Sequence, residues 1–197
     1  MSSEFLGTVD HIGEVKTPAP RIKGIHHMAY RCRDAEETRK FYVDLLGLKQ
    51  SAALAFDKDP GGRDRPYMHL FFEMGDGNFI AFFDAPASAS DDVFKMKDGI
   101  EDYHFAFEVE TKDEQEAFIQ RLKEAKVPVF GPINHHFCHS IYFFDPNGLS
   151  CEITLKDAKH DEILADESSR ADIVMKAWSE KTRTLKAAKL SVFKAAD

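Results

Sequence analysis

Several features that would assign the chain to a particular class of protein are missing from its sequence. No apolar run approaches the roughly 18 residues of a membrane-spanning helix, so we expect no membrane partner. Acidic residues outnumber basic ones by 34 to 26, and the net charge of −8 argues against nucleic-acid binding. The first ten residues do not resemble a secretion signal, and Cys32, Cys138 and Cys151 have no CxxC spacing. We therefore expect a cytoplasmic protein with reduced, structural thiols.

Hydrophobic residues, by contrast, are plentiful enough to build a substantial core. They make up 43% of the 197 residues and include 17 phenylalanines. Residues 1–23 have no clear period and are predicted to form an N-terminal arm before a domain over residues 24–156. Residues 157–197 form a C-terminal extension, in which we predict a charged loop over 157–168 and a lysine-rich amphipathic helix over 169–189.

The central region contains an internal repeat, with one copy over about residues 24–84 and a second over 103–156. Four pairs of like residues lie 77 positions apart: His27 and His104, Ala29 and Ala106, Phe41 and Phe118, and Leu45 and Leu122. In the later hairpin the offset falls to 71, which matches Ala81 with Glu152. Each copy predicts the order strand, helix, strand, strand, strand, and residues 85–102 form a polar connector. The predicted segments are 25–32, 34–46, 50–56, 67–73 and 78–83, then 103–109, 112–125, 127–130, 140–144 and 149–155.

The repeat places two histidines and one carboxylate at related positions. Alternate side chains of a strand share a face, so His27 and His104 lie opposite the apolar faces of their strands and are expected to point toward one another. Glu152 lies on the last strand among apolar neighbours, where a buried carboxylate needs a partner. Two imidazoles and one carboxylate match the triad that binds Fe(II) in many oxygenases. The alternative is a solvent-facing glutamate and two ordinary core histidines.

Two segments of the first copy resemble a known superfamily. GIHHMAY from Gly24 and FYVDLLG from Phe41 are similar to segments of vicinal oxygen chelate proteins, which include glyoxalase I, bleomycin- and fosfomycin-resistance proteins and type I extradiol dioxygenases. The resemblance covers about residues 24–156 and implies an α+β fold in which two βαβββ modules form an incomplete barrel around a metal. It assigns the metal ligands to His27, His104 and Glu152. Ala81 stands where glyoxalase I has a fourth ligand, a departure that favours the three-ligand dioxygenase pattern.

A longer pattern near the end of the domain is similar to the extradiol dioxygenase signature. It consists of His135, five residues, Ile141 and Tyr142, then the turn Asp145-Pro-Asn-Gly, then Glu152. The resemblance implies an Fe(II) enzyme that cleaves a catechol-like aromatic ring with O₂. It also implies that Tyr142 hydrogen-bonds the metal-bound oxygen and that His135 donates a hydrogen bond to the substrate.

One position departs from the dioxygenase pattern. The hairpin over residues 75–78 lacks the acid–base histidine of that family, and His69, His136 or His139 could replace it. Phe79 and Phe83 are expected either to form an aromatic wall for a planar ring or to be ordinary core residues.

Other functions remain open on the sequence. A lyase or isomerase of the same superfamily would use Mn, Zn, Ni or Co. A non-catalytic protein would bind an aromatic ligand without turnover. An incomplete barrel with a long terminal helix also leads us to expect a homodimer.

Overall fold

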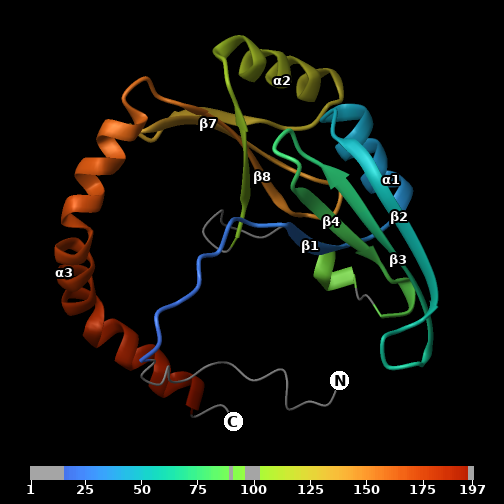
Figure 1. Cartoon of the computed structure of the whole chain (residues 1–197), viewed down its shortest axis with the longest axis horizontal. Helices are drawn as coiled ribbons and strands as arrows, with labels where there is room; N and C mark the ends of the chain where they lie inside the picture. The colour runs from blue at the N-terminus through green and yellow to red at the C-terminus, as the bar shows by residue number, and fades with distance from the viewer. Residues whose placement is uncertain (1–15, 89–90, 96–102, 195–197) are drawn as a thin grey trace. The chain divides into compact units, whose positions relative to one another are not determined.

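The computed structural model describes residues 16–88, 91–95 and 103–194, and its architecture is α+β (Figure 1). Four strands form one sheet in the order β1-β4-β3-β2, and four form a second in the order β5-β8-β7-β6. The repeated order predicted from the sequence is therefore confirmed. The strands are β1 His27–Cys32, β2 Lys49–Lys58, β3 Asp64–Glu73, β4 Phe79–Asp84, β5 Phe105–Val109, β6 Phe130–Asn134, β7 Cys138–Phe144 and β8 Ser150–Lys156, and the α-helices are α1 Ala35–Arg39, α2 Lys112–Glu124 and α3 His160–Lys194.

The chain folds as two compact units, each built from several segments. The first holds the described residues of 1–105, with 118–129 and 143–151. The second holds 106–117, 130–142 and the described residues from 152 onward.

The first sheet is mixed, because β1 runs parallel to β4 whereas β3 runs antiparallel to both β2 and β4. Its register aligns Ala29 of β1 with Ala81 of β4 and Phe71 of β3. The turn between β3 and β4 is tight, and Gly77 has a φ of +80°, a backbone conformation that glycine adopts without strain. The predicted hairpin over residues 75–78 is thus confirmed.

The helical segment after β1 is capped at its start by Asp34. Asp34 accepts a hydrogen bond from the backbone N–H of Glu37 at 2.7 Å, and Gly47 follows the helical segment with a φ of +81°. The structure departs from one continuous α-helix, because α1 changes at Lys40 into a π-helical turn that extends to Leu45. This turn directs Tyr42 into the core, where its ring stacks on Phe72 with a centroid distance of 5.6 Å.

The second copy shows two differences from the prediction. The strand expected over 103–109 begins at Phe105, so His104 lies just before β5. The strand expected over 127–130 is wrong, because β6 covers Phe130–Asn134. Val127 donates its N–H to the carbonyl of Leu122 at 2.8 Å and thereby closes the end of α2. The β propensity of two valines is overridden by this helix end.

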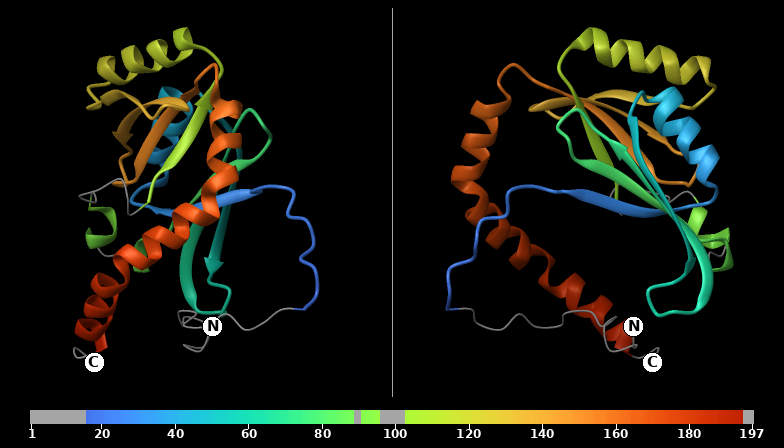
Figure 2. Two further views of the ribbon diagram at one scale, coloured as in Figure 1. Left: turned by 90° about the vertical axis from the view of Figure 1, so that its left-hand side faces the viewer. Right: turned by 45° about the vertical axis from the view of Figure 1, so that its right-hand side comes forward.

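The predicted loop over 157–168 is also wrong, since α3 begins at His160 and continues through this segment (Figure 2). The Asp157 carboxylate accepts a hydrogen bond from the Lys159 N–H at 2.9 Å and so orders the start of the helix. Asp161 and Glu162 in the first turn interact favourably with the helix dipole. Charged residues in this segment therefore form a helix rather than a loop. In the described part of the chain, no helix is long and apolar enough to span a membrane.

The arm and the connector are described only in part. Residues 16–26 have no helix or strand, 1–15 lie outside the described residues, and the arm over 1–23 stays a prediction. Short 3₁₀ turns occupy Pro86–Ser88 and Asp91–Phe94 of the connector, and 89–90 and 96–102 lie outside the described residues.

Candidate functional site

One face of the first sheet is rich in aromatic rings and imidazoles. Strand alternation and the observed register bring together the side chains that occupy odd-numbered positions of β1, β3 and β4. In three successive rows these are His27, Phe79 and Glu73, then Ala29, Ala81 and Phe71, then Arg31, Phe83 and His69.

The rings on this face are in mutual contact. His69 stacks on Phe83 with ring centroids 3.8 Å apart and lies 4.3 Å from Phe71. The ring of Phe71 lies 5.6 Å from His27 and 5.8 Å from Phe79. The three phenylalanines are only half-buried, so the face offers an aromatic surface with two imidazoles. Phe71 thus joins Phe79 and Phe83 on this face, and the role of the two predicted rings as an aromatic wall or as core residues stays a prediction.

His27 is exposed and has one ring nitrogen engaged. Its Nδ1 lies 2.9 Å from Nδ1 of His26, so one of these two nitrogens donates and the other accepts. In the tautomer in which His27 donates, its Nε2 carries the lone pair that a ligand needs. The neighbouring histidine therefore orients His27 through the nitrogen that is not required for coordination.

His69 has an unusual environment for a histidine. Its Nε2 is buried and has no hydrogen-bond partner among the residues that the structure describes. Burial, followed by the neighbouring His27, lowers the pKa of His69 below its ordinary value of 6.5. The imidazole is therefore neutral at neutral pH and able to accept a proton.

Three predicted residues come together in the second unit. The Nε2 of His135 lies 2.9 Å from the Tyr142 hydroxyl. Ser140 of β7 donates a hydrogen bond to Thr154 of β8 at 3.1 Å, so alternation places Tyr142 and Glu152 on the same side of these strands. Tyr142 is 6% exposed and Glu152 is 5% exposed. The result is a polar group of a half-buried imidazole, a buried phenol and a buried carboxylate.

The environment of Tyr142 keeps its hydroxyl protonated. Burial raises the pKa of Tyr142 above its ordinary value of 10.0, and the negative charge of Glu152 raises it further. Glu152 also acts as a hydrogen-bond partner of the phenol. An ionised carboxylate can only accept, so the phenol donates to Glu152 and the imidazole of His135 donates to the phenol oxygen. These three side chains thus form a directed chain of hydrogen bonds.

The structure does not test the full metal triad. His27 and His104 belong to the first unit and Glu152 to the second. Across residues 16–88, 91–95 and 103–194, no group of three or more His, Cys, Asp or Glu side chains forms a cluster able to hold a metal. The triad of His27, His104 and Glu152 therefore stays a prediction.

The histidines proposed as substitutes for the missing acid–base residue differ clearly. His139 lies 3.1 Å from the Asp157 carboxylate. His136 is exposed in a turn, with a φ of +71°. His69 alone of the three lies on the aromatic face of the first sheet, beside His27. Alternation along β3 is enough to place His69 on the same face as Phe71. Its neighbours on the adjacent strands follow only from the sheet register.

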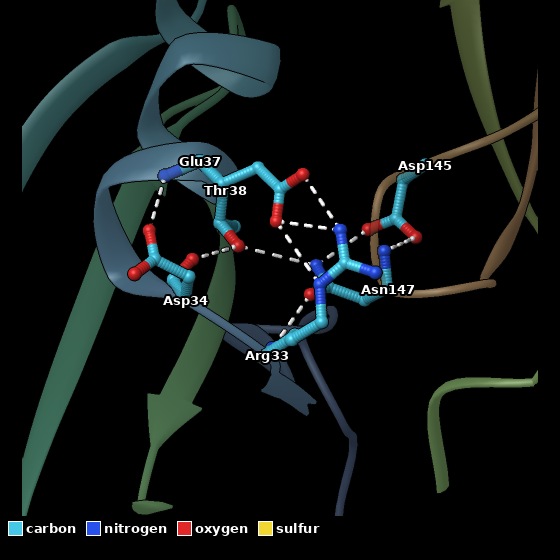
Figure 3. A network of polar contacts seen from close by, with 6 residues as sticks. All are labelled: Arg33, Asp34, Glu37, Thr38, Asp145 and Asn147. Carbon is cyan, nitrogen blue, oxygen red and sulfur yellow. Dashed lines mark hydrogen bonds and ion pairs between the residues drawn. The ribbon is translucent and has the colours of Figure 1, made fainter. Parts of the chain in front are cut away.

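The turn between β7 and β8 is fastened to α1 within the first unit (Figure 3). The Asn147 side chain accepts a hydrogen bond from the Arg33 N–H at 2.8 Å and donates to Thr38 Oγ1 at 3.2 Å. Asp145 accepts from the Asn147 side chain at 2.9 Å and from the Tyr42 hydroxyl at 3.0 Å. The Asp-Pro-Asn-Gly segment thus has a structural role, because it joins the hairpin of the second copy to the helix of the first.

Comparisons with known proteins agree with this architecture. Residues 24–153 match the family model described as the Glyoxalase/Bleomycin resistance protein/Dioxygenase superfamily. A comparison with curated proteins gives no match. The chain is also similar to several solved structures, all with low sequence identity.

A glyoxalase/dioxygenase from Nostoc punctiforme is 24% identical, with 75% of this chain and 99% of that chain covered and a TM-score of 0.55. A glyoxylase/bleomycin resistance protein/dioxygenase domain from Frankia sp. EAN1pec is 17% identical, with 70% and 100% covered and a TM-score of 0.56. The fosfomycin resistance protein FosX from Listeria monocytogenes, complexed with Mn(II) and sulfate, is 17% identical, with 72% and 98% covered and a TM-score of 0.51. At these identities the likeness establishes the fold.

Proposed function

This chain belongs to the glyoxalase/bleomycin resistance protein/dioxygenase superfamily, and we propose that it is an Fe(II)-dependent, extradiol-type dioxygenase that cleaves a catechol-like aromatic ring. The observation that carries the proposal is the 2.9 Å contact between His135 and Tyr142 on the strand face of the buried Glu152. A phenol held between an imidazole and a carboxylate is suited to hydrogen-bond an oxygen of the substrate.

The metal would be held by His27, His104 and Glu152. The donor set fits Fe(II), because an exposed imidazole and a buried carboxylate are ligand types that this ion accepts. The buried Nε2 of His69, whose ring lies 6.3 Å from that of His27, lacks a hydrogen-bond partner within the described residues, as expected where a polar ligand binds. When bound, the metal supplies Lewis-acid activation and a template for two substrate oxygens and O₂.

The protein's own residues orient and deprotonate the substrate in this proposal. Tyr142 retains its proton at neutral pH, because its pKa is raised, and donates a hydrogen bond to a substrate oxygen. His135 fixes the direction of the phenol through its 2.9 Å contact. His69, which is neutral at this pH, accepts a proton from a substrate hydroxyl in place of the missing hairpin histidine.

The aromatic face explains the choice of substrate class. Phe71, Phe79 and Phe83 are half-buried and present ring surfaces against which a planar ring can stack. Arg31 lies in the same row as Phe83 and His69, where a cation favours a substrate that carries negative charge. A catecholate combines a planar ring with anionic oxygens and therefore suits both features.

Metal content of the protein, purified without oxygen, tests this proposal. We expect iron at about one ion per chain. The substitution His27→Ala removes a ligand and should abolish retention of iron, whereas His136→Asn, which changes an exposed histidine, should leave iron content unchanged. Equal iron in the wild type and in His27→Ala would exclude the proposed ligand set.

One observation favours a second function. The hairpin over residues 75–78 carries no histidine to handle protons derived from dioxygen. A lyase or isomerase that uses Mn, Zn, Ni or Co does not need that residue. Such a metal together with unchanged oxygen levels would identify this alternative. Tight binding of an aromatic ligand with neither metal nor turnover would identify a binding protein.

A further inference from the structure

Helix α3 exposes an apolar stripe that the rest of the described chain leaves largely uncovered. The positions of Leu164, Ala171, Met175, Trp178 and Leu185 follow spacings of seven, four, three and seven residues, so all five lie on one face of the helix. Met175 is 68% exposed, Trp178 56% and Leu185 69%. The stripe spans about 32 Å at 1.5 Å per residue. Its period of three and four residues is the pattern through which two helices pack together.

Thr182 is the exception on this face. It is buried, and its hydroxyl donates to the carbonyl of Trp178 at 2.9 Å. Its small side chain falls between Trp178 and Leu185, which both remain exposed. The stripe is therefore covered at Thr182 and exposed at the large apolar side chains on either side of it.

The charges beside the stripe are distributed unevenly along α3. Residues 160–175 carry five carboxylates and one guanidinium, a net charge of −4, whereas residues 176–186 carry four basic groups and one carboxylate, a net charge of +3. Several of these charges are compensated within the helix, as in the pairs Arg183–Glu180 and Arg170–Asp166. Asp172, Lys176 and Lys186 form no ion pair with any described residue. Opposite ends of the helix thus retain opposite charge.

We propose that the partner of this stripe is α3 of a second copy, packed antiparallel to the first. Antiparallel packing sets the acidic half of each helix beside the basic half of the other, and it covers both apolar stripes in one symmetric contact. Parallel packing would place like charges together at both ends, and repulsion of this kind selects against a pairing. The expected homodimer is thereby assigned a specific surface, independent of the metal site.

The mass of the full-length protein in solution is the first test. A concentration series by light scattering should show twice the 22.3 kDa of one chain, with dissociation on dilution or at high salt. Trp178→Asp introduces a charge into the stripe and should give a monomer. Ile173→Asp is the matched control, because Ile173 is 73% exposed on the other side of α3, and it should leave the dimer intact.

Fluorescence provides a second readout, because Trp178 is the single tryptophan of the chain. Its emission should shift to shorter wavelength as the protein concentration rises and the ring is covered. The same shift should be absent from a Leu185→Asp variant, which keeps Trp178 but introduces a charge into the stripe. An emission that is already blue-shifted and independent of concentration would show that residues of the same chain cover the stripe, and it would overturn the proposal.

Cross-linking distinguishes the two orientations. In the antiparallel pair, Glu167 of one copy lies near Lys181 of the other. Mixing Glu167→Cys with Lys181→Cys should yield a disulfide-linked heterodimer, while either variant alone should cross-link poorly. Efficient cross-linking of Glu167→Cys with itself would indicate parallel packing. A protein that is still monomeric at about 100 µM, or a dimer that is unaffected by Trp178→Asp, would also contradict the proposal.

Discussion

At the scale of single residues, the position of protons determines what the buried polar group can do. The Tyr142 phenol lies between His135 and Glu152, and these two neighbours together determine whether it donates or accepts each hydrogen bond. Because Glu152 can only accept when ionised, the direction of donation runs from imidazole to phenol to carboxylate. A substrate oxygen that replaces the carboxylate as acceptor would take the same phenol proton. In the proposed function, this group would bind an anionic oxygen of the substrate.

Replacing His135 tests this direction of donation. His135→Asn removes the Nε2 that contacts Tyr142, and turnover should fall by about 10²-fold, as for the loss of one positioned donor. Iron content should stay unchanged, because His135 is not a proposed ligand. The control is His136→Asn, since asparagine tolerates the positive φ at that position. Equal turnover in both variants would remove His135 from the mechanism.

The three thiols allow a prediction that does not depend on catalysis. Cys32, Cys138 and Cys151 are all buried, and burial raises the pKa of Cys32 to about 12. Since the thiolate is the reactive form, none of the three should react rapidly with DTNB in the native protein. Three equivalents should react after denaturation. Rapid reaction of one thiol in the native state would show that its site opens.

The sequence predicts the face on which a strand residue lies, but not its neighbours on the adjacent strands. Strand alternation was enough to assign the faces of His27 and of the strand that follows His104, since both faces require only a period of two. The roles of His135 and Tyr142 came from a resemblance and stay predictions, whereas their 2.9 Å contact is a finding of the structure that the sequence did not indicate. The neighbours of His69 were not predictable, because they depend on the register of β3 against β4.

At the scale of elements, a turn and a helix from different copies of the repeat are joined by buried hydrogen bonds. Asn147 is 2% exposed and contacts Arg33, Thr38 and Asp145 through its side chain. Arg33 directly follows the last residue of β1, and its N–H donates to the Asn147 side chain instead of to a neighbouring strand. The sequence suggested a turn at Asp145-Pro-Asn-Gly, but it gave no indication that this turn fastens α1.

Removing this amide should destabilise the fold. Asn147→Ala leaves the N–H of Arg33 without its partner and should lower the free energy of unfolding by about 1–3 kcal/mol. The control Asn78→Ala removes an amide that, within the described residues, contacts the exposed Asp76 side chain, and it should have a smaller effect. Urea unfolding of both variants measures the difference. A similar loss for the two variants would contradict the role assigned to Asn147.

Element ends account for most of the departures from the predicted elements. Local propensity predicted a strand at residues 127–130. In the structure Val127 instead caps the end of α2 through a hydrogen bond to Leu122, and β6 begins only at Phe130. A charged run at 157–168 suggested a loop, although an ordering aspartate and acidic first-turn residues favour a helix. Strand and helix centres were predicted well, because their periods extend over many residues.

At the scale of the whole molecule, the repeated order of elements was predictable and is confirmed by the two four-stranded sheets. Membership of the superfamily follows from the match over residues 24–153. The chemistry of an individual member is decided by a few positions, of which Ala81 and the histidine-free hairpin at 75–78 are the most informative in this chain. In the proposed dioxygenase, the first favours three protein ligands, and the second calls for another proton acceptor, for which we propose His69.

Oxygen uptake by the iron-loaded protein with a panel of catechols tests the central claim most directly. The proposed activity predicts consumption of one O₂ per ring and a yellow ring-opened product, both lost in His27→Ala and retained in His136→Asn. An iron-loaded protein that consumes no oxygen with any catechol, or equal uptake by the His27→Ala variant, would contradict a dioxygenase that acts through this site.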